Sequence, residues 1–135
     1  MSPFVWQARV YWEDTDAGGI VYYANYLRFL ERARSEWLRA RGVSQLALAS
    51  DPGVVFSVVA LEVQYRRPAR LDDLLSISCE PEWEGGASIV FAQRIWREPV
   101  DEELLVTASV RVACLDAGTL KPRRLPPVIV RELSA

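Results

Sequence analysis

Hydrophobic and polar positions change their spacing several times along the chain, and each change marks a predicted element. Residues 4–12 alternate between the two kinds, which predicts a first strand. Over Tyr26–Arg41 the apolar positions recur every three or four residues, which predicts one long amphipathic helix. Asn25 is placed to cap the start of this helix, and Gly42 is placed just past its last turn.

After the helix the pattern becomes that of strands. Val43–Ser50 predicts a short helical turn. Four later segments rich in apolar and β-branched residues are interpreted as strands: Val54–Arg66, Leu74–Trp83, Ala87–Arg97 and Leu104–Leu115. The glycines at positions 85 and 86 predict a hairpin turn between the middle two. The tail, with prolines at 122, 126 and 127, is expected to run extended before a brief apolar segment.

A strand, one long helix and then consecutive strands predict the α+β fold class, in a single domain over residues 1–135. We expect an antiparallel sheet of about five strands, curled around the buried side of the helix. Both faces of the strand Val54–Arg66 are apolar, with Val55, Ser57, Val59 and Leu61 on one and Phe56, Val58 and Ala60 on the other. One domain of this size does not cover both faces, so we expect pairing with a second copy.

Composition narrows the function mainly by what it excludes. The net charge of −2 on 135 residues gives no general electrostatic reason to bind nucleic acid or an anionic membrane. No apolar run is long enough to insert across a bilayer. Cys79 and Cys114 lie in apolar stretches without motif spacing, which indicates buried free thiols in a reducing compartment. A cytoplasmic location is therefore expected.

The chain contains no histidine. A Ser-His-Asp or Cys-His catalytic site is therefore impossible, as is a histidine-rich zinc site. Near neutral pH, ionisable chemistry would have to come from a carboxylate, a tyrosine, a cysteine or the single lysine, Lys121, which lies in the proline-flanked tail. Asp72-Asp73 is not accompanied by further ligands, so no metal or other cofactor is expected.

The acidic turn Glu13–Gly19 directly precedes the predicted helix. The first backbone N–H groups of a helix have no partner inside it, and that end carries the positive pole of the helix dipole. A carboxylate beside these donors, such as Asp16, is in most proteins a cap or a turn residue. It can also be half of a reaction centre, and the pattern of residues alone leaves both interpretations open.

Several motifs carry a resemblance that covers nearly the whole chain. They are R-V-Y-W-E-D-T-D-A-G-G-I-V-Y-Y-A-N-Y-L-R-F-L-E-R-A-R (9–34), Y-R-R-P-A-R-L-D-D-L-L (65–75), G-G-A-S-I-V-F-A-Q-R-I (85–95) and K-P-R-R-L-P (121–126). In this order they resemble hotdog-fold acyl-CoA thioesterases of the 4-hydroxybenzoyl-CoA thioesterase type. Within that group the chain is most similar to the Tol-Pal-associated bacterial acyl-CoA thioesterases.

The resemblance implies two catalytic positions. The family's catalytic carboxylate falls on Asp16, which would act as a nucleophile or as a base that activates water. The backbone N–H that holds the thioester carbonyl falls on Tyr23. Many relatives carry histidine there, so a role of the histidine ring is lost in this chain, whereas the backbone role is retained.

The same resemblance implies how the substrate lies. Gly18 and Gly19 would let the acyl group come close to the backbone, and Val21 and Tyr26 are expected to border it. Relatives that bind the CoA phosphates with a basic cluster after the third strand are not matched, because the turn 84–87 here is acidic and glycine-rich. Contacts to the nucleotide then come from elsewhere, with Arg66, Arg67 or Arg70 as the candidates, or are weak, and surface charge is the simpler interpretation of these arginines.

The implied function is hydrolysis of short or medium acyl-CoA thioesters by a homo-oligomer, either a dimer or a dimer of dimers, that is, a homotetramer. Two alternatives stay open beside it. The first is a hotdog protein that is non-catalytic or binds acyl carrier protein, and that is associated with phospholipid or envelope machinery. The second is a hotdog dehydratase, which is disfavoured because that chemistry generally pairs a histidine with the carboxylate.

Overall fold

The computed structural model describes residues 4–83, 85–99 and 102–134. Its strands are β1 (Phe4–Arg9), β2 (Val54–Tyr65), β3 (Leu74–Glu82), β4 (Ser88–Arg97) and β5 (Glu103–Asp116). Its helices are α1 (Tyr26–Ala40), α2 (Gln45–Ser50) and α3 (Pro127–Ser134), and two 3₁₀ turns, Trp12–Asp14 and Tyr23–Asn25, stand between β1 and α1. The four strands predicted after the helix are confirmed, with each end within one residue of the prediction.

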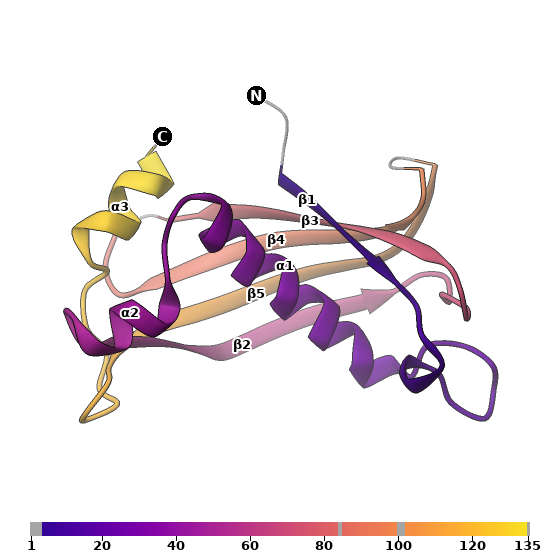
Figure 1. Ribbon diagram of the computed structural model, residues 1–135, viewed down its shortest axis with the longest axis horizontal. Helices are drawn as coiled ribbons and strands as arrows, with labels where there is room; N and C mark the ends of the chain where they lie inside the picture. Colours follow the sequence, from indigo (N-terminus) through magenta and orange to yellow (C-terminus); the bar gives the residue numbers. More distant parts are fainter. Residues whose placement is uncertain (1–3, 84, 100–101, 135) are drawn as a thin grey trace.

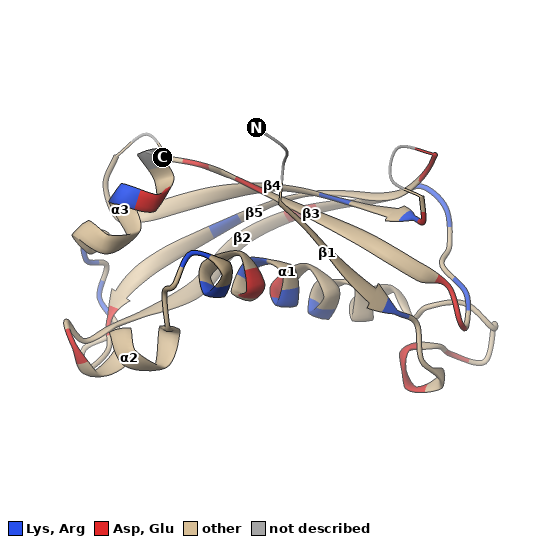
Figure 2. Ribbon diagram, turned by 45° about the horizontal axis from the view of Figure 1, so that its top comes forward, with Lys and Arg blue, Asp and Glu red and all other residues tan. Residues whose placement is uncertain are grey.

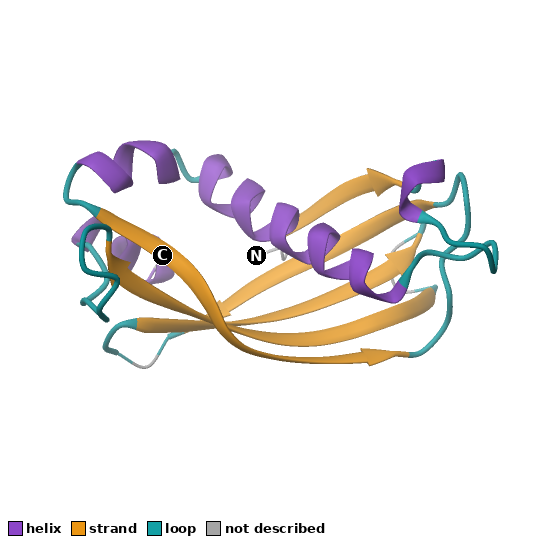
Figure 3. Cartoon of the chain, turned by 90° about the horizontal axis from the view of Figure 1, so that it is seen from below, coloured by secondary structure: helices purple, strands orange, loops and turns teal. Residues whose placement is uncertain are grey.

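The strands form one antiparallel sheet in the order β1-β3-β4-β5-β2, so β1 and β2 are its edges. The helix α1 crosses one face of the sheet diagonally (Figure 1), and the sheet curves around it (Figure 3). This is the α+β arrangement that the sequence predicts. Residue 84 of the expected turn lies outside the described residues, but Gly85 and Gly86 both have positive φ and join β3 to β4 as the predicted hairpin.

One side of α1 makes the core, while charged residues of both signs lie along the helix (Figure 2). Its buried residues are Tyr26, Phe29, Leu30, Ala33, Trp37 and Leu38. The helix ends as predicted at Gly42, which has a φ of +77°. The N–H of Val43 donates to the Leu38 carbonyl and that of Gly42 to the Arg39 carbonyl, both at 3.0 Å, which is the Schellman pattern.

Two terminal segments differ from the prediction. The first strand ends at Arg9 rather than at Trp12, because a 3₁₀ turn begins at Trp12. The tail is not extended throughout, since its apolar segment forms α3 with Pro127 at the first helical position, where its missing N–H costs nothing. Ile129 of α3 is fully buried in the same core cluster as Trp37. A six-residue apolar run is too short to show this period unambiguously.

The prediction of which β2 residues share a face is wrong beyond Val58. A bulge between Val58 and Ala60 shifts the register, so that Val58 lies opposite Val112 and Leu61 lies opposite Val110. Val110 and Val112 both belong to the buried core, so Val58 and Leu61 lie on the core side of the sheet. They are nevertheless 42 % and 46 % exposed. The edge strand therefore carries apolar surface that the described part of the chain leaves uncovered.

Candidate active site

The turn that leads into the long helix contains backbone donors without a partner in the described part of the chain. A 3₁₀ turn leads into α1, and it is held by bonds from the Tyr22 N–H to the Asp14 carbonyl (2.9 Å) and from the Asn25 N–H to the Tyr22 carbonyl (2.8 Å). Among the described residues, the N–H groups of Tyr23 and Ala24 have no acceptor. Since Tyr23 is 62 % exposed, the positive end of the helix presents free donors at the surface.

Asp14 is a buried carboxylate that holds this turn in place. Its Oδ2 accepts a hydrogen bond from the Tyr11 N–H (2.8 Å), and its Oδ1 accepts one from Nδ2 of Asn25 (2.9 Å). Asn25 does stand at the predicted cap position of α1, but its side chain makes no cap hydrogen bond to the helix. The capping prediction is therefore right about the position and wrong about the side chain, which joins the helix start to the acidic turn.

Asp16 lies in an exposed turn closed by glycine. Its Oδ1 accepts from the Gly18 N–H (2.8 Å), its N–H donates to the Ile20 carbonyl (3.0 Å), and its carbonyl accepts from the Gly19 N–H (3.0 Å). A Cβ on Gly18 would lie 3.1 Å from Oδ1 of Asp16, and Gly19 has a φ of +78°. Within the described residues Asp16 forms no ion pair and its Oδ2 has no partner, so one carboxylate oxygen is available for chemistry.

A shallow depression of about 270 Å³ lies beside the start of α1. It is lined by Ile20, Val21, Tyr23, Tyr26, Tyr65, Arg66, Arg67 and Pro68. It therefore brings together Val21, Tyr23, Tyr26, Arg66 and Arg67 from the residues that the sequence proposes for the site. Asp16, Gly18 and Gly19 do not line it, because they lie on the preceding turn.

Two tyrosines fix the wall of this depression. The hydroxyl of Tyr26 accepts from the Ala69 N–H (3.0 Å), and burial raises the pKa of Tyr26, so the phenol stays neutral. The hydroxyl of Tyr65 donates to the carbonyl of Tyr23 (3.1 Å), and its ring meets the Tyr23 ring edge-on at 6.2 Å between centroids. The sequence prediction did not assign Tyr65 to the site, because in the sequence it is only one aromatic residue of the apolar strand Val54–Arg66.

Arg66 and Arg67 form the cationic rim of the depression. The N–H groups of both donate to the Leu105 carbonyl, at 2.8 Å and 3.2 Å, so the backbone is fixed while the side chains are exposed. The guanidinium of Arg66 donates to Gln64 (3.0 Å). That of Arg67 has no partner among the described residues. Exposed guanidinium groups at a pocket rim suit phosphate groups, which they can bind through paired N–H donors.

Other kinds of site find little support in the geometry. Among the described residues, no three cysteine, aspartate or glutamate side chains come together as a metal ion would need. Both cysteines are buried and unpaired, as predicted, and burial raises the pKa of the Cys79 thiol to about 12. Neither thiol is therefore a nucleophile near neutral pH. No helix in the described residues is long and apolar enough to span a membrane.

Comparison with known proteins shows the family of the chain. Residues 18–110 match the model of the thioesterase superfamily. The chain belongs to the thioesterase superfamily. The acyl-CoA thioester hydrolase YbgC of Escherichia coli O157:H7 is 50 % identical over 129 residues, which cover 96 % of this chain and 94 % of the relative. The acyl-CoA thioesterase YbgC of Haemophilus influenzae is 45 % identical, over 91 % of this chain and 88 % of the relative.

A solved structure of this superfamily agrees with the fold. A probable thioesterase from Bartonella henselae superimposes with a TM-score of 0.85 and 42 % sequence identity, covering 93 % of this chain and all of that chain. The long helix on a five-stranded antiparallel sheet is therefore the hotdog fold, as the motifs imply.

Proposed function

We propose that the protein hydrolyses acyl-CoA thioesters, with the Asp16 carboxylate as nucleophile or general base and the Tyr23 N–H as donor to the thioester carbonyl. The observation that carries this proposal is the Tyr23 N–H, which has no acceptor among the described residues and lies in the exposed 3₁₀ turn that leads into α1. It follows, in the same segment of the chain, an exposed carboxylate that forms no ion pair among those residues. The thioesterase superfamily supports the reaction class, and the identity with the YbgC relatives supports acyl-CoA as the substrate.

Hydrolysis of a thioester requires few catalytic groups from the protein. During hydrolysis, negative charge develops on the carbonyl oxygen, and an N–H fixed at a helix start is already aimed at such a charge. If Asp16 attacks, the C–S bond breaks, CoA leaves as a thiolate that takes a proton from water, and a second water hydrolyses the mixed anhydride. If Asp16 is a base, it removes a proton from the water that attacks the carbonyl. Both routes give a carboxylic acid and the CoA thiol.

The depression suits a modest acyl group. Val21 and Tyr26 give it an apolar wall, and Gly18 and Gly19 keep the turn before it free of side chains. We propose short or medium acyl groups on this ground, with Arg66 or Arg67 at the phosphates of CoA. A thioester of acyl carrier protein would meet the same cationic rim, so that protein remains an alternative carrier of the acyl group.

We propose that a second copy of the whole domain, residues 1–135, completes the site. The depression lies at the end of β2, whose core-facing residues Val58, Leu61 and Tyr65 are all more than two-fifths exposed. Pairing along this edge would cover that apolar surface and wall the depression on its open side. A dimer or a dimer of dimers follows, and unpaired thiols at Cys79 and Cys114 favour the cytoplasm.

Release of free thiol from a panel of acyl-CoAs tests the proposed function. Saturated substrates from acetyl-CoA to palmitoyl-CoA, together with benzoyl-CoA, are each incubated with the purified protein and a thiol reagent. We expect turnover, with the highest kcat/KM for a short or medium aliphatic group. No thiol release from any substrate, together with recovery of a bound acyl carrier protein, would instead support the binding role.

A further inference from the structure

One buried residue connects the two halves of the proposed site. Ala69 lies in the loop between β2 and β3 and is fully buried. Its carbonyl accepts from the Val21 N–H (2.9 Å), and its N–H donates to the hydroxyl of Tyr26 (3.0 Å). Val21 follows the turn that carries Asp16, and Tyr26 stands in the first turn of α1. The position of Ala69 therefore fixes how the acidic turn lies against the helix start.

The loop that contains Ala69 is tied to β5 at its start, where the Arg66 and Arg67 N–H groups donate to the Leu105 carbonyl, but among the described residues Pro68 and Ala69 make no backbone hydrogen bond to a strand. Because the strand order is β1-β3-β4-β5-β2, the β2–β3 connection has to pass over the ends of β4 and β5. It has no regular secondary structure over residues 66–69. Side chains at the ends of β4 and β5 are therefore needed to hold Pro68 and Ala69 in place.

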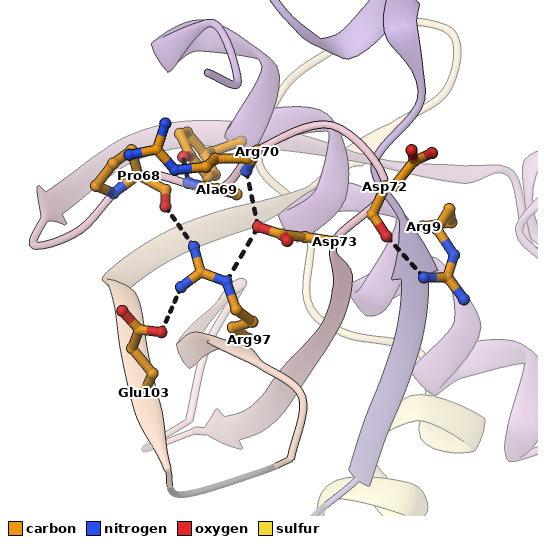
Figure 4. A network of polar contacts seen from close by, with 9 residues as sticks. Arg9, Pro68, Ala69, Arg70, Asp72, Asp73, Arg97 and Glu103 are labelled. Atoms are coloured by element: carbon orange, nitrogen blue, oxygen red, sulfur yellow. Dashed lines mark hydrogen bonds and ion pairs between the residues drawn. The ribbon is translucent and has the colours of Figure 1, made fainter. Parts of the chain in front are cut away.

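Arg97, the last residue of β4, holds the loop in this position (Figure 4). Its Nη2 donates to the Pro68 carbonyl (2.7 Å) and its Nε donates to Oδ2 of Asp73 (3.0 Å). The guanidinium therefore binds the loop on both sides of Ala69. Its Nη1 donates to the carboxylate of Glu103, the first residue of β5. One planar guanidinium thus connects a carbonyl and a carboxylate of the β2–β3 loop to a carboxylate of β5.

The end of the loop at Asp72 and Asp73 is also held by hydrogen bonds. Oδ2 of Asp73 also accepts from the Arg70 N–H (2.8 Å), and the Asp73 carbonyl accepts from the Val10 N–H (2.9 Å). Arg9 donates to the Asp72 carbonyl (2.7 Å), which completes the network in Figure 4. Loss of Arg97 would therefore free Pro68 and remove one of two donors from Asp73.

We propose that Arg97 is a positioning residue of the hydrolytic site. By holding the Pro68–Asp73 loop, it keeps Ala69 in the place from which Ala69 sets the geometry between Asp16 and the Tyr23 N–H. This inference rests on the proposed function, because it assigns Arg97 a role in a reaction that those two groups carry out. Arg97 itself touches no substrate.

Arg97→Lys is the direct test, because lysine keeps the charge but cannot reach three acceptors through a planar fork. A misplacement of about 1 Å at a reacting group can cost about a hundredfold in rate, so we expect kcat to fall by about tenfold to a hundredfold while KM stays within about twofold. Arg94→Lys is the matched control. Arg94 lies on the same strand, is exposed, and its guanidinium has no hydrogen-bond partner in the described residues, so parental kinetics are expected.

A second readout separates positioning from stability. Hydrogen exchange at the Val21 and Ala69 amides, measured in a folded sample well below its melting temperature, is expected to speed up in Arg97→Lys and not in Arg94→Lys. A folded Arg97→Lys protein whose kcat stays within about twofold of the parent overturns the inference. So does a rise in KM alone, or a fall in kcat without faster exchange at these two amides. If Arg97→Lys does not fold, Asp73→Asn is judged by the same criteria.

Asp16→Asn is measured beside these variants so that two failures can be told apart. If Asp16→Asn keeps the parental rate, the proposed function of Asp16 fails whatever Arg97 does. If Asp16→Asn is inactive and Arg97→Lys behaves as the parent, only the role of Arg97 is wrong.

Discussion

The side-chain amide of Asn25 donates to the buried carboxylate of Asp14 at 2.9 Å, across eleven residues of chain. Both residues are only 7 % exposed. Because Asp14 precedes the turn that carries Asp16, and Asn25 follows Tyr23, this bond closes the segment that holds both proposed catalytic groups. The acidic turn and the helix start therefore form one small structural unit.

Removing the amide of Asn25 should weaken this unit. In Asn25→Ala, a buried carboxylate loses one of its two donors, and hydrogen bonds to charged groups contribute about 1.5–3 kcal/mol. We expect the free energy of unfolding, from urea denaturation, to fall by about that amount. Gln45→Ala is the control, since its amide bonds to Ser35 at an exposed site and should change stability by less than about 0.5 kcal/mol. Equal effects in both variants would contradict this role of Asp14.

The turn glycine Gly18 should matter to activity more than to stability. A Cβ there would stand 3.1 Å from Oδ1 of Asp16, closer than an ordinary contact, so Gly18→Ala must displace the carboxylate. Gly118 offers a matched control, because its N–H donates to Oδ1 of Asp116 (2.9 Å) in a similar turn and its Cβ would lie 3.4 Å away. We expect kcat to fall about tenfold or more in Gly18→Ala and to stay at the parental value in Gly118→Ala. Thiol release at saturating substrate measures both.

The overall fold could be predicted from the sequence because its signals are local. The spacing of apolar residues in α1, the left-handed glycine at Gly42 and the glycine pair before β4 each specify their own structure. The bulge in β2 could not be predicted, because it depends on the register against β5. The helix α3 was missed because its burial depends on a core built by residues far away in the sequence.

The candidate site, like the fold, could be predicted from the sequence only in part. Asp16 and Tyr23 were proposed from a motif, which marks them without giving their geometry. The contacts that hold their neighbours are long-range: Asp14 with Asn25, Tyr65 with Tyr23, and Arg97 with Pro68. No spacing rule indicates such pairs, since they arise where separate elements meet at one end of the sheet.

The apolar edge of β2 predicts self-association. Leu61→Asp puts a charge on core-side surface that the described chain leaves 46 % exposed, and burying that charge between copies would be costly. We expect sedimentation velocity to show a shift toward monomer and thiol release to fall with it. Leu120→Asp is the control, because Leu120 is 62 % exposed in the turn after β5 and is not a residue of β2. If Leu61→Asp sediments as the parent does, the proposed pairing along β2 is wrong.

The buried thiols predict how stability responds to alkaline pH. Burial raises the pKa of Cys79 to about 12, whereas an unfolded cysteine has a pKa of about 8.5. The folded state therefore holds this proton more tightly, so its contribution is complete below about pH 8.5 and is lost as the pH rises toward 12. We expect Cys79→Ala to flatten this decline in urea denaturation curves. Alkylation of Cys79 at about pH 8 in the folded protein would contradict this burial.

Asp16→Asn tests most directly whether the carboxylate of Asp16 does chemistry. Asparagine keeps the size of the side chain and an oxygen that can accept from the Gly18 N–H, so the fold should remain intact. Asp116→Asn, in the similar turn after β5, is the control for the change itself. We expect thiol release from the best acyl-CoA to fall by at least about a thousandfold in Asp16→Asn and to be unchanged in Asp116→Asn. Release at the parental rate by folded Asp16→Asn would contradict it.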